Sequence, residues 1–345
     1  MLTAELDYHL PVQSIAQHPL AERDASRLLH VCVDGRLADC AFTDLPGLLR
    51  AGDLLVVNQT RVRRARLAAT DSAGRQVELL VLRRCSDATF LCLSKPAKRA
   101  PPGAELRVNH SLAAVVVAAS ADHPGARLVR FDAEHGEVDA AMERAGSAPL
   151  PPYIHERLSD QDRYQTTYAA GAPLSAAAPT AGLHFTERVR DALRQRGVGW
   201  AAVELEVGLG TFAPIRSDSL EQHLMHEERY SVSSEAAERI KATRDSGGRI
   251  VAVGTTVVRT LESAARDGTV HASSGSTRLF ITPGYDFHVI DGLLTNYHQP
   301  RSSLLALLAG FIGTDAWRAA YDHALAAGYR FLSFGDCMLC WRLQR

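Results

Sequence analysis

The chain lacks the features that mark several classes of protein. None of its 345 residues lies in an apolar run near the ~20 residues that a membrane-spanning helix needs. The formal net charge of −1 excludes the global positive field of many nucleic-acid-binding proteins, so any RNA contact must come from local clusters. The N-terminal residues carry no basic segment followed by an apolar core, and no secretory signal is expected. We therefore predict a cytoplasmic protein that makes no membrane contact.

Metal-binding and disulfide patterns are also missing. Six cysteines in a chain without a secretory signal fit reduced thiols. Cys337 and Cys340 form a single CxxC without a second pair, and we expect them to be buried as small hydrophobic residues. His223 and His226 are three residues apart with no third ligand in frame. The sequence predicts no metal ion and no resident cofactor.

The order of β-like and helical runs predicts two domains. Residues 61–150 contain short β-like runs at 77–82, 89–93, 106–108, 112–118 and 127–131, separated by turn signals, with one helical piece at 138–144. Many short strands with turns between them indicate a small antiparallel β-barrel. We expect this barrel to be inserted into an α/β domain made of residues 1–60 and 151–345.

The predicted α/β domain alternates strands with helices, which indicates a mostly parallel sheet with helices on its faces. Asp34-Gly35 predicts a hairpin between strands 26–33 and 36–42, and the apolar run 54–57 predicts a strand buried on both faces. The remaining predicted strands are 201–207, 249–253, 279–281 and 329–334. The predicted helices are 45–49, 186–196, 234–245, 257–266, 303–311 and 316–326.

The stretch APTAGLHFT, residues 178–186, has the pattern of a loop that leads into a helix. Thr186 is a plausible N-cap, and Gly182 would allow the backbone to approach a ligand closely. His184 would then stand at a helix start, where outward-pointing N–H groups can meet a substrate. An imidazole near its unperturbed pKa could accept a proton there. The alternative is that His184 only caps or packs.

Three further stretches could carry chemistry. GTTVVR, residues 254–259, places two hydroxyls at a helix start after a strand, where an anion could bind and Arg259 could clamp it. VGLGTF, residues 207–212, is a second glycine-rich turn after a strand, and His226 follows it in an acid- and histidine-rich segment. Residues 295–301 form a polar loop before an apolar helix. Asp336 places one carboxylate at a predicted strand end.

Basic side chains gather at the entry to the predicted barrel, in the loop 95–99 and along helix 186–196. The functional interpretation is contact with RNA phosphates, and the alternative is a solvated surface. The predicted RNA-binding residues are Arg61, Arg63, Arg64, Lys95, Lys98 and Arg99.

Taken together, the motifs resemble the S-adenosylmethionine:tRNA ribosyltransferase-isomerases of queuosine biosynthesis. Single motifs are weak, but the ordered set covers essentially the whole chain. The matching stretches are IAQHP (15–19), RDASRL (23–28), NQTRV (58–62), KPAK (95–98), LPPYI (150–154), DRYQT (162–166), APTAGLHFT (178–186), VGLGTF (207–212), MH (225–226), VGTTVVRTLE (253–262), PGY (283–285), LTNYH (294–298) and YRFLSFGDCML (329–339).

The resemblance implies transfer and isomerisation of the ribosyl part of S-adenosylmethionine onto 7-aminomethyl-7-deazaguanine at the tRNA wobble position. The product is epoxyqueuosine-tRNA, adenine and methionine leave, and S-adenosylmethionine is consumed as a co-substrate. It also implies an α/β domain with an inserted β-barrel. The alternatives are a paralogue that uses S-adenosylmethionine on another acceptor, and an RNA-binding protein without catalysis. We expect a monomer whose partners are tRNA and S-adenosylmethionine.

Proton transfer is the role predicted for His184, His226 and Asp336, which all fall in matching motifs. The predicted substrate-binding residues are Thr180, Gly182, Gly208, Gly210, Thr211, Gly254, Thr255, Thr256, Arg259, Tyr285, Asn296 and His298.

Overall fold

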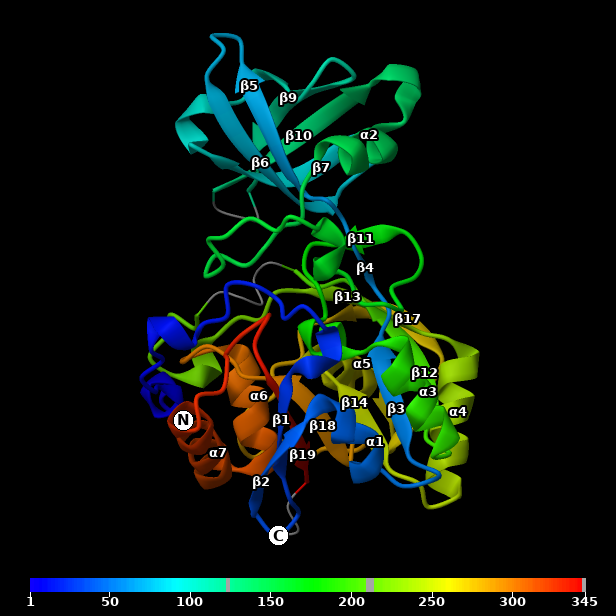
Figure 1. The fold of residues 1–345 in the computed structure, drawn as a ribbon. Helices are drawn as coiled ribbons and strands as arrows, with labels where there is room; N and C mark the ends of the chain where they lie inside the picture. Colours follow the sequence, from blue (N-terminus) through cyan, green and yellow to red (C-terminus); the bar gives the residue numbers. More distant parts are fainter. Residues whose placement is uncertain (122–124, 209–213, 343–345) are drawn as a thin grey trace. The chain divides into compact units, whose positions relative to one another are not determined.

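The computed structural model describes residues 1–121, 125–208 and 214–342, and its chain divides into two compact units (Figure 1). The first, the α/β unit, consists of Met1–Thr60, Pro151–Gly171 and Pro179–Arg345. The second, the barrel unit, consists of Arg61–Leu150 and Ala172–Ala178. The barrel unit has a hydrophobic core of its own, and the α/β unit has two.

The barrel unit contains the predicted closed antiparallel barrel. Its strands, in spatial order, are β10 (Ala126–Ala133), β7 (Thr89–Lys95), β6 (Gln76–Arg84), β5 (Arg66–Asp71), β8 (Glu105–Arg107) and β9 (Leu112–Ala119). Buried and exposed residues alternate along β6, as expected for a strand that fills a barrel interior on one face. Helix α2 (Val138–Ala145) adds Val138 and Met142 to the same core. A two-stranded sheet joins β4 (Arg61–Val62) to β11 (Pro173–Ser175).

The α/β unit contains a nine-stranded sheet. Its order is β17 (Ser273–Thr277), β13 (Glu228–Val232), β12 (Gly199–Leu205), β3 (Leu54–Asn58), β14 (Ile250–Val253), β18 (Gly292–Asn296), β19 (Cys337–Trp341), β1 (Arg27–Val31) and β2 (Leu37–Ala41). The run from β12 to β18 is parallel, and so is the pair β1 and β19. The pairs at both edges and the pair β18 and β19 are antiparallel, so the sheet is mixed. A small hairpin pairs β15 (Ala265–Arg266) with β16 (Thr269–Val270).

Helices cover both faces of this sheet, which explains why its central strands are apolar throughout. Along β3, Leu55 and Val57 pack with α1 and α3, whereas Leu54 and Val56 pack in the core of the opposite face, with α4 to α7. The helices are α1 (Leu45–Leu48), α3 (Glu187–Gln195), α4 (Ser234–Asp245), α5 (Thr255–Ala264), α6 (Ser303–Ile312) and α7 (Thr314–Ala326). No helix among the described residues has the length and apolar character to cross a membrane.

Two predicted strands are wrong. Residues 279–281 are irregular, and the carbonyl of Leu279 accepts a hydrogen bond from Arg259 Nε instead of a strand partner. Residues 329–334 are also not a strand, because Leu332 has a φ of 68° and the N–H of Arg330 is bound by the Asp336 carboxylate. The last strand is instead β19, which begins at Cys337 and contains both buried cysteines of the CxxC.

Candidate active site

Polar side chains from four elements meet at one edge of the central sheet. Asn296 ends β18, and Asp336 directly precedes β19, which runs antiparallel to β18. Ser26 directly precedes β1, which runs parallel to β19. His184 ends the 3₁₀ helix η8 (Thr180–His184), just before α3. Because these strand ends lie at the same edge of the sheet, residues far apart in sequence form one buried polar cluster.

His184 is buried, and both of its ring nitrogens are hydrogen bonded. Nδ1 lies 2.8 Å from Ser26 Oγ, and Nε2 lies 3.1 Å from Asn296 Nδ2. The ring also lies 5.2 Å from that of Phe42, measured between centroids. Thr186 is the N-cap of α3, as predicted, because its hydroxyl accepts the N–H of Val189. This cap lies two residues after His184 and holds the chain that follows η8. His184 therefore has one defined orientation.

The same bonds determine which nitrogen of His184 carries the proton. Asn296 Nδ2 also lies 3.3 Å from the carbonyl oxygen of Asp336, which can only accept, so the amide nitrogen faces both groups. His184 Nε2 is therefore an acceptor, and Nδ1–H donates to Ser26. Asn296 Oδ1 is buried and has no hydrogen-bond partner in the described part of the chain. This amide oxygen is available to a substrate donor.

Burial and two neighbouring arginines make the His184 imidazole neutral. Burial is the larger cause, and the charges of Arg330 and Arg23 act in the same direction, lowering the pKa of His184 to about 4. The expectation of an imidazole near its unperturbed pKa is therefore wrong. The ring is a neutral hydrogen-bonding group at cellular pH and a weaker base than a solvated histidine.

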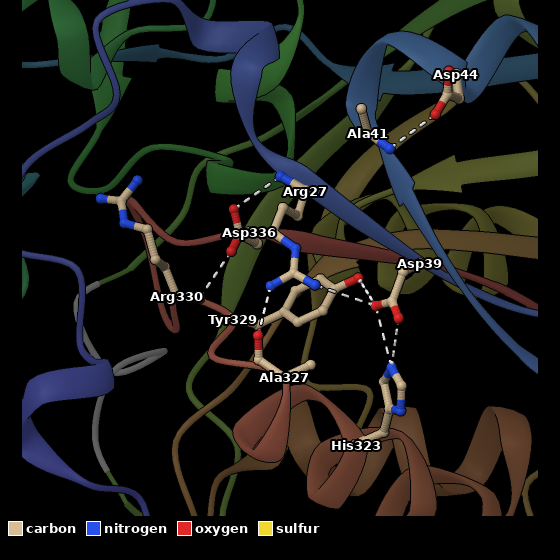
Figure 2. Close-up of polar contacts among 9 residues, drawn as sticks. All are labelled: Arg27, Asp39, Ala41, Asp44, His323, Ala327, Tyr329, Arg330 and Asp336. Atoms are coloured by element: carbon tan, nitrogen blue, oxygen red, sulfur yellow. Dashed lines mark hydrogen bonds and ion pairs between the residues drawn. The ribbon is translucent and has the colours of Figure 1, made fainter.

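The Asp336 carboxylate is held by the protein backbone (Figure 2). Oδ1 accepts the N–H of Arg27 at 2.9 Å, and Oδ2 accepts the N–H of Arg330 at 2.8 Å. Asp336 is 2% exposed. The Arg27 side chain stacks on Tyr329, and both donate to Asp39, so the backbone that holds Asp336 is itself fixed. In this arrangement the Asp336 carboxylate orients the backbone at Arg27 and Arg330. The backbone carbonyl of Asp336 orients the Asn296 side chain.

Three of the predicted substrate-binding residues line one pocket. Thr180, Asn296 and His298 lie there with Tyr153, Ser302 and Ser333. His298 Nε2 is 3.0 Å from Thr295 Oγ1, and burial lowers the pKa of His298 to about 3. This pocket, which we call the Asn296 pocket, is therefore lined by neutral polar groups. The predicted loop 295–301 is partly wrong, because Thr295 and Asn296 end β18, but residues 296–299 line the pocket.

A second pocket contains the start of α5. Thr255, Thr256 and Arg259 line it, together with Ser303 and apolar side chains. Gly254 has a φ of 89° and is the N-cap residue of the helix, so the N-cap position has no side chain. Both pockets also include Leu304, so they are adjacent. Free N–H groups at this terminus favour an anion.

Arg259 does not fit its predicted role as a free clamp for a carboxylate. Its guanidinium is 5% exposed, pairs with Glu228 and donates to the carbonyls of Leu279 and Thr277. Glu228 also accepts the N–H of Gly208 at 2.9 Å. Arg259 and Glu228 thus link Gly208 to α5. Gly210 and Thr211 of the glycine-rich turn lie outside the described residues.

Gly182 is explained by packing, contrary to the expectation of close ligand approach. A Cβ at Gly182 would lie 2.0 Å from the Tyr168 hydroxyl and 2.9 Å from Thr166 Cγ2. Any side chain would therefore displace Tyr168. Gly182 is needed so that η8 can lie against these two residues.

Among the described residues, two other predicted ones do not line either of the two pockets above. His226 is exposed on the segment before β13, although its neighbour Met225 lines the α5 pocket. Tyr285 donates to Glu262 at 3.3 Å. Burial and the Glu262 carboxylate raise the pKa of Tyr285 to about 12. The geometry gives neither residue a partner in the His184 cluster.

The predicted RNA-binding residues differ in exposure. Arg61, Lys95 and Lys98 are exposed. Arg63 does not fit the prediction, because it is buried, stacks over Phe90 and donates to the Pro173 carbonyl. Arg64 and Arg99 are partly buried and donate to the carbonyls of Glu143 and Gln76. The basic residues of α3 are largely neutralised by Asp24, Glu187 and Asp191.

Sequence reasoning missed several site residues that lie inside the quoted motifs. Ser26 is hydrogen bonded to Nδ1 of His184. Arg23 and Arg163 line the pocket beside this ring, and the charge of Arg330 acts on it. The only local signal was the co-occurrence of arginines in three matching motifs. Within the described ranges, no three His, Cys, Asp or Glu side chains are grouped to hold a metal ion.

Comparisons with known proteins agree over almost the whole chain. Residues 3–340 match the sequence model of a family described as queuosine biosynthesis protein. The chain is 50% identical over 341 residues to an S-adenosylmethionine:tRNA ribosyltransferase-isomerase of Azoarcus sp. (strain BH72), covering 98% of this chain and 97% of the relative. It is 48% identical to the protein of that name from Moorella thermoacetica, covering 98% and 99%. A crystal structure of S-adenosylmethionine tRNA ribosyltransferase from Thermotoga maritima shares 36% identity with a TM-score of 0.56, covering 97% and 99%.

Proposed function

The chain belongs to the queuosine biosynthesis protein family, and we propose that it is an S-adenosylmethionine:tRNA ribosyltransferase-isomerase. It moves the ribosyl part of S-adenosylmethionine onto 7-aminomethyl-7-deazaguanine at the tRNA wobble position and isomerises it, giving epoxyqueuosine-tRNA. Adenine and methionine leave, and S-adenosylmethionine is consumed rather than retained. The observation that carries this proposal is the similarity to named ribosyltransferase-isomerases over nearly the full length of both chains.

The reaction needs an anion site for the methionine carboxylate, and the start of α5 is our candidate. Thr255 and Thr256 supply hydroxyls at a helix terminus whose N-cap residue, Gly254, has no side chain. The partial positive charge of such a terminus stabilises a carboxylate. Because Arg259 is paired with Glu228, we assign it the role of fixing this terminus and the Gly208 turn, not of binding the carboxylate itself.

The reacting part of the substrate is assigned to the Asn296 pocket. Asn296 Oδ1 is buried without a partner among the described residues, which suits a substrate N–H or O–H donor. Thr180 and His298 supply neutral polar groups at the same pocket. Adenine and the deazaguanine acceptor both carry N–H donors that match an amide oxygen.

His184 is our candidate for proton transfer, with Nε2 as its basic atom. The Asn296 amide, which donates to Nε2, leaves the proton on Nδ1, and the lowered pKa keeps Nε2 unprotonated at cellular pH. To take a proton from the substrate, Nε2 must exchange its bond to Asn296 for one to the substrate, a rearrangement that apo geometry allows. Asp336 is a positioning residue in this scheme, and His226 is the alternative proton carrier.

We further propose that the barrel unit contacts tRNA and that the protein acts as a monomer. Arg61, Lys95 and Lys98 are exposed cations that can contact tRNA phosphates. We expect one chain to be sufficient for activity, with no resident cofactor. Sedimentation at working concentration tests the monomer, and turnover after exhaustive chelation tests the absence of a metal.

The decisive experiment measures products. Purified protein is incubated with S-adenosylmethionine and either tRNA bearing 7-aminomethyl-7-deazaguanine or the same tRNA with guanine at the wobble position. Adenine and methionine should appear only with the precursor-bearing tRNA, in equal amounts with modified tRNA. Release with another acceptor alone would indicate a paralogous activity, and tRNA binding without release under any condition would indicate an RNA-binding protein.

A further inference from the structure

A third pocket lies beside His184 and has a cationic wall. Arg23, Arg163, Ser26 and His184 line it, together with Ser333 and apolar residues. Arg330 is close enough for its charge to lower the pKa of His184, as does that of Arg23. Ser333 also lines the Asn296 pocket, so the two pockets are adjacent. We call this third pocket the arginine pocket.

The three arginines are held by carbonyl groups and not by carboxylates. Arg23 donates to the carbonyls of Leu183 and Asp162 at 3.2 and 2.9 Å. Arg163 donates to those of Ala21 and Leu20 at 2.8 and 2.6 Å, and Arg330 donates to that of His18. Across the described ranges, none of the three forms an ion pair with an acidic side chain. Their positive charge is therefore fixed in position but not neutralised.

The surroundings leave this charge uncompensated. Arg163 Nε and Arg330 Nη1 are shielded from solvent and have no hydrogen-bond partner among the described residues. The acidic groups whose charges act on these arginines are Asp160, Asp162 and Asp336. Of these, Asp336 is already bound by two backbone N–H groups. Burial and the charge of Arg163 lower the pKa of Arg23, and burial lowers that of Arg330, so an anion bound here would stabilise their charged forms.

We propose that the arginine pocket binds a phosphodiester group of the tRNA next to the wobble nucleotide. This inference rests on the proposed function, because it takes tRNA as the substrate. Guanidinium groups present paired donors that match the oxygens of a phosphate. Arg23 and Arg163 line the pocket, and the charge of Arg330 acts on His184, which lines it too. The pocket adjoins the Asn296 pocket, so a phosphate bound here would hold its nucleotide beside the reacting groups. The other anion of the reaction, the methionine carboxylate, has its own site at α5.

The first test uses the unaltered protein and chemically altered RNA. Anticodon stem–loop RNAs carry a single neutral methylphosphonate at each phosphate of the loop in turn, and their affinities are measured by fluorescence anisotropy. A substitution next to the wobble nucleotide should weaken binding roughly 10-fold, as loss of a charge-assisted contact does. Equal affinities for all loop substitutions would overturn the proposal, whatever the variants below do.

The second test couples the RNA to the pocket. Arg163→Gln should weaken binding of the unmodified RNA by a similar factor and lower the salt-dependence slope by about 0.7. The sensitive methylphosphonate should then have no further effect in Arg163→Gln, because both changes remove the same contact. Arg196→Gln is the matched control, since Arg196 is exposed at the end of α3. If Arg163→Gln is not folded by circular dichroism, Arg23→Gln takes its place.

A third measurement distinguishes a tRNA phosphate from the methionine carboxylate as the anion in the arginine pocket. It also tests the pocket assignment separately from the proposed function. S-adenosylmethionine binding, measured by calorimetry, should be unchanged in the pocket variant. Weaker S-adenosylmethionine binding with an unchanged RNA salt slope would assign the pocket to the methionine carboxylate and overturn the phosphate assignment. Because these are binding measurements, they hold even if the unaltered protein releases no adenine, and that result would count against the proposed function alone.

Discussion

The interiors of the two units differ in what they bury. The α/β unit encloses polar side chains at one sheet edge, among them His184, Asn296, His298 and Asp336. The barrel encloses apolar side chains such as Leu67, Phe90, Val129 and Phe131. Of the buried polar side chains in the described ranges, Arg63 and Ser175 belong to the barrel unit. Burying polar groups costs free energy unless they are paired. The α/β unit bears this cost in its polar cluster, and the proposed reaction gives the reason for it. The barrel needs only shape and a charged surface.

Among the variants that test this difference between the two units, we expect the largest effect from removal of the His184 side chain. His184→Ala should lower single-turnover adenine release by ~10²–10⁴-fold with both substrates saturating, because it removes the proton carrier and the partner of Asn296. His110→Ala, at an exposed position of the barrel unit, should leave release unchanged. A variant that melts earlier yet turns over within a few-fold of the parent would make His184 structural.

Truncation in the barrel core should affect stability and RNA binding instead of chemistry. Phe131→Ala removes a buried ring that packs edge-to-face on Phe90 at 5.7 Å, which should cost about 3–5 kcal/mol. Hydrogen exchange should show lost protection in strands β5 to β10 and retained protection in β3 and β14. S-adenosylmethionine affinity that fell along with barrel protection would contradict the separation of roles.

Asp336→Asn tests whether a buried carboxylate is structural. The amide would replace one acceptor with a donor, leaving the N–H of Arg27 or Arg330 unpaired, at a cost of about 1–3 kcal/mol. Denaturant unfolding measures this cost. If Asp336 only positions its neighbours, the variant at low temperature should keep the pH profile of adenine release; a shifted profile would return Asp336 to the proton-transfer candidates.

Acid should destabilise the polar cluster first. His184 and His298 have folded pKa values of about 4 and 3, below the ~6.5 of an unfolded histidine. Below pH 6.5 the unfolded chain therefore binds protons that the folded chain does not, and stability falls as pH decreases, by about 1.4 kcal/mol per pH unit for each residue. Denaturation at pH 7.5, 6 and 5 checks this slope, which should be shallower in His184→Gln. Equal slopes would mean that His184 is protonated in the fold.

The smallest expected effect concerns the surface of the barrel. Lys95→Ala combined with Lys98→Ala should flatten the log–log salt dependence of tRNA binding by about one to two units without changing stability. Arg99→Ala serves as the comparison, since Arg99 already donates to the Gln76 carbonyl and should contribute less. Unchanged affinity and slope in the double variant would remove this loop from the RNA footprint.

Local signals predicted most elements, and long-range contacts decided the rest. The Asp34-Gly35 hairpin and the Thr186 cap depend on neighbours in sequence, and both were predicted correctly. Residues 329–334 have the composition of a strand, but two hydrogen bonds hold them in another conformation. The N–H of Phe331 donates to the carbonyl of Ser14, and the N–H of Arg330 donates to the Asp336 carboxylate. β19 was missed because its partners, β18 and β1, are not neighbours in sequence.

The site was predictable as a set of motifs but not as a set of contacts. His184, Asn296 and Asp336 were identified, yet their hydrogen bonds join positions more than 30 residues apart. Burial of Arg63 and pairing of Arg259 with Glu228 also depend on tertiary packing, so neither could be predicted from the sequence. The lowered pKa of His184 has the same origin, because desolvation is not a property of local sequence.

The position of β19 has a consequence for synthesis on the ribosome. β19 lies between β18 and β1, so β1 and β2 cannot join the rest of the central sheet until Cys337–Trp341 has been translated. The barrel strands end at Ala133, about 200 residues earlier, which at typical rates is roughly 10–40 s of elongation. During that interval β1 can pair with β2, but its other edge has no partner until β19 has been made. That apolar edge is where a chaperone would be needed.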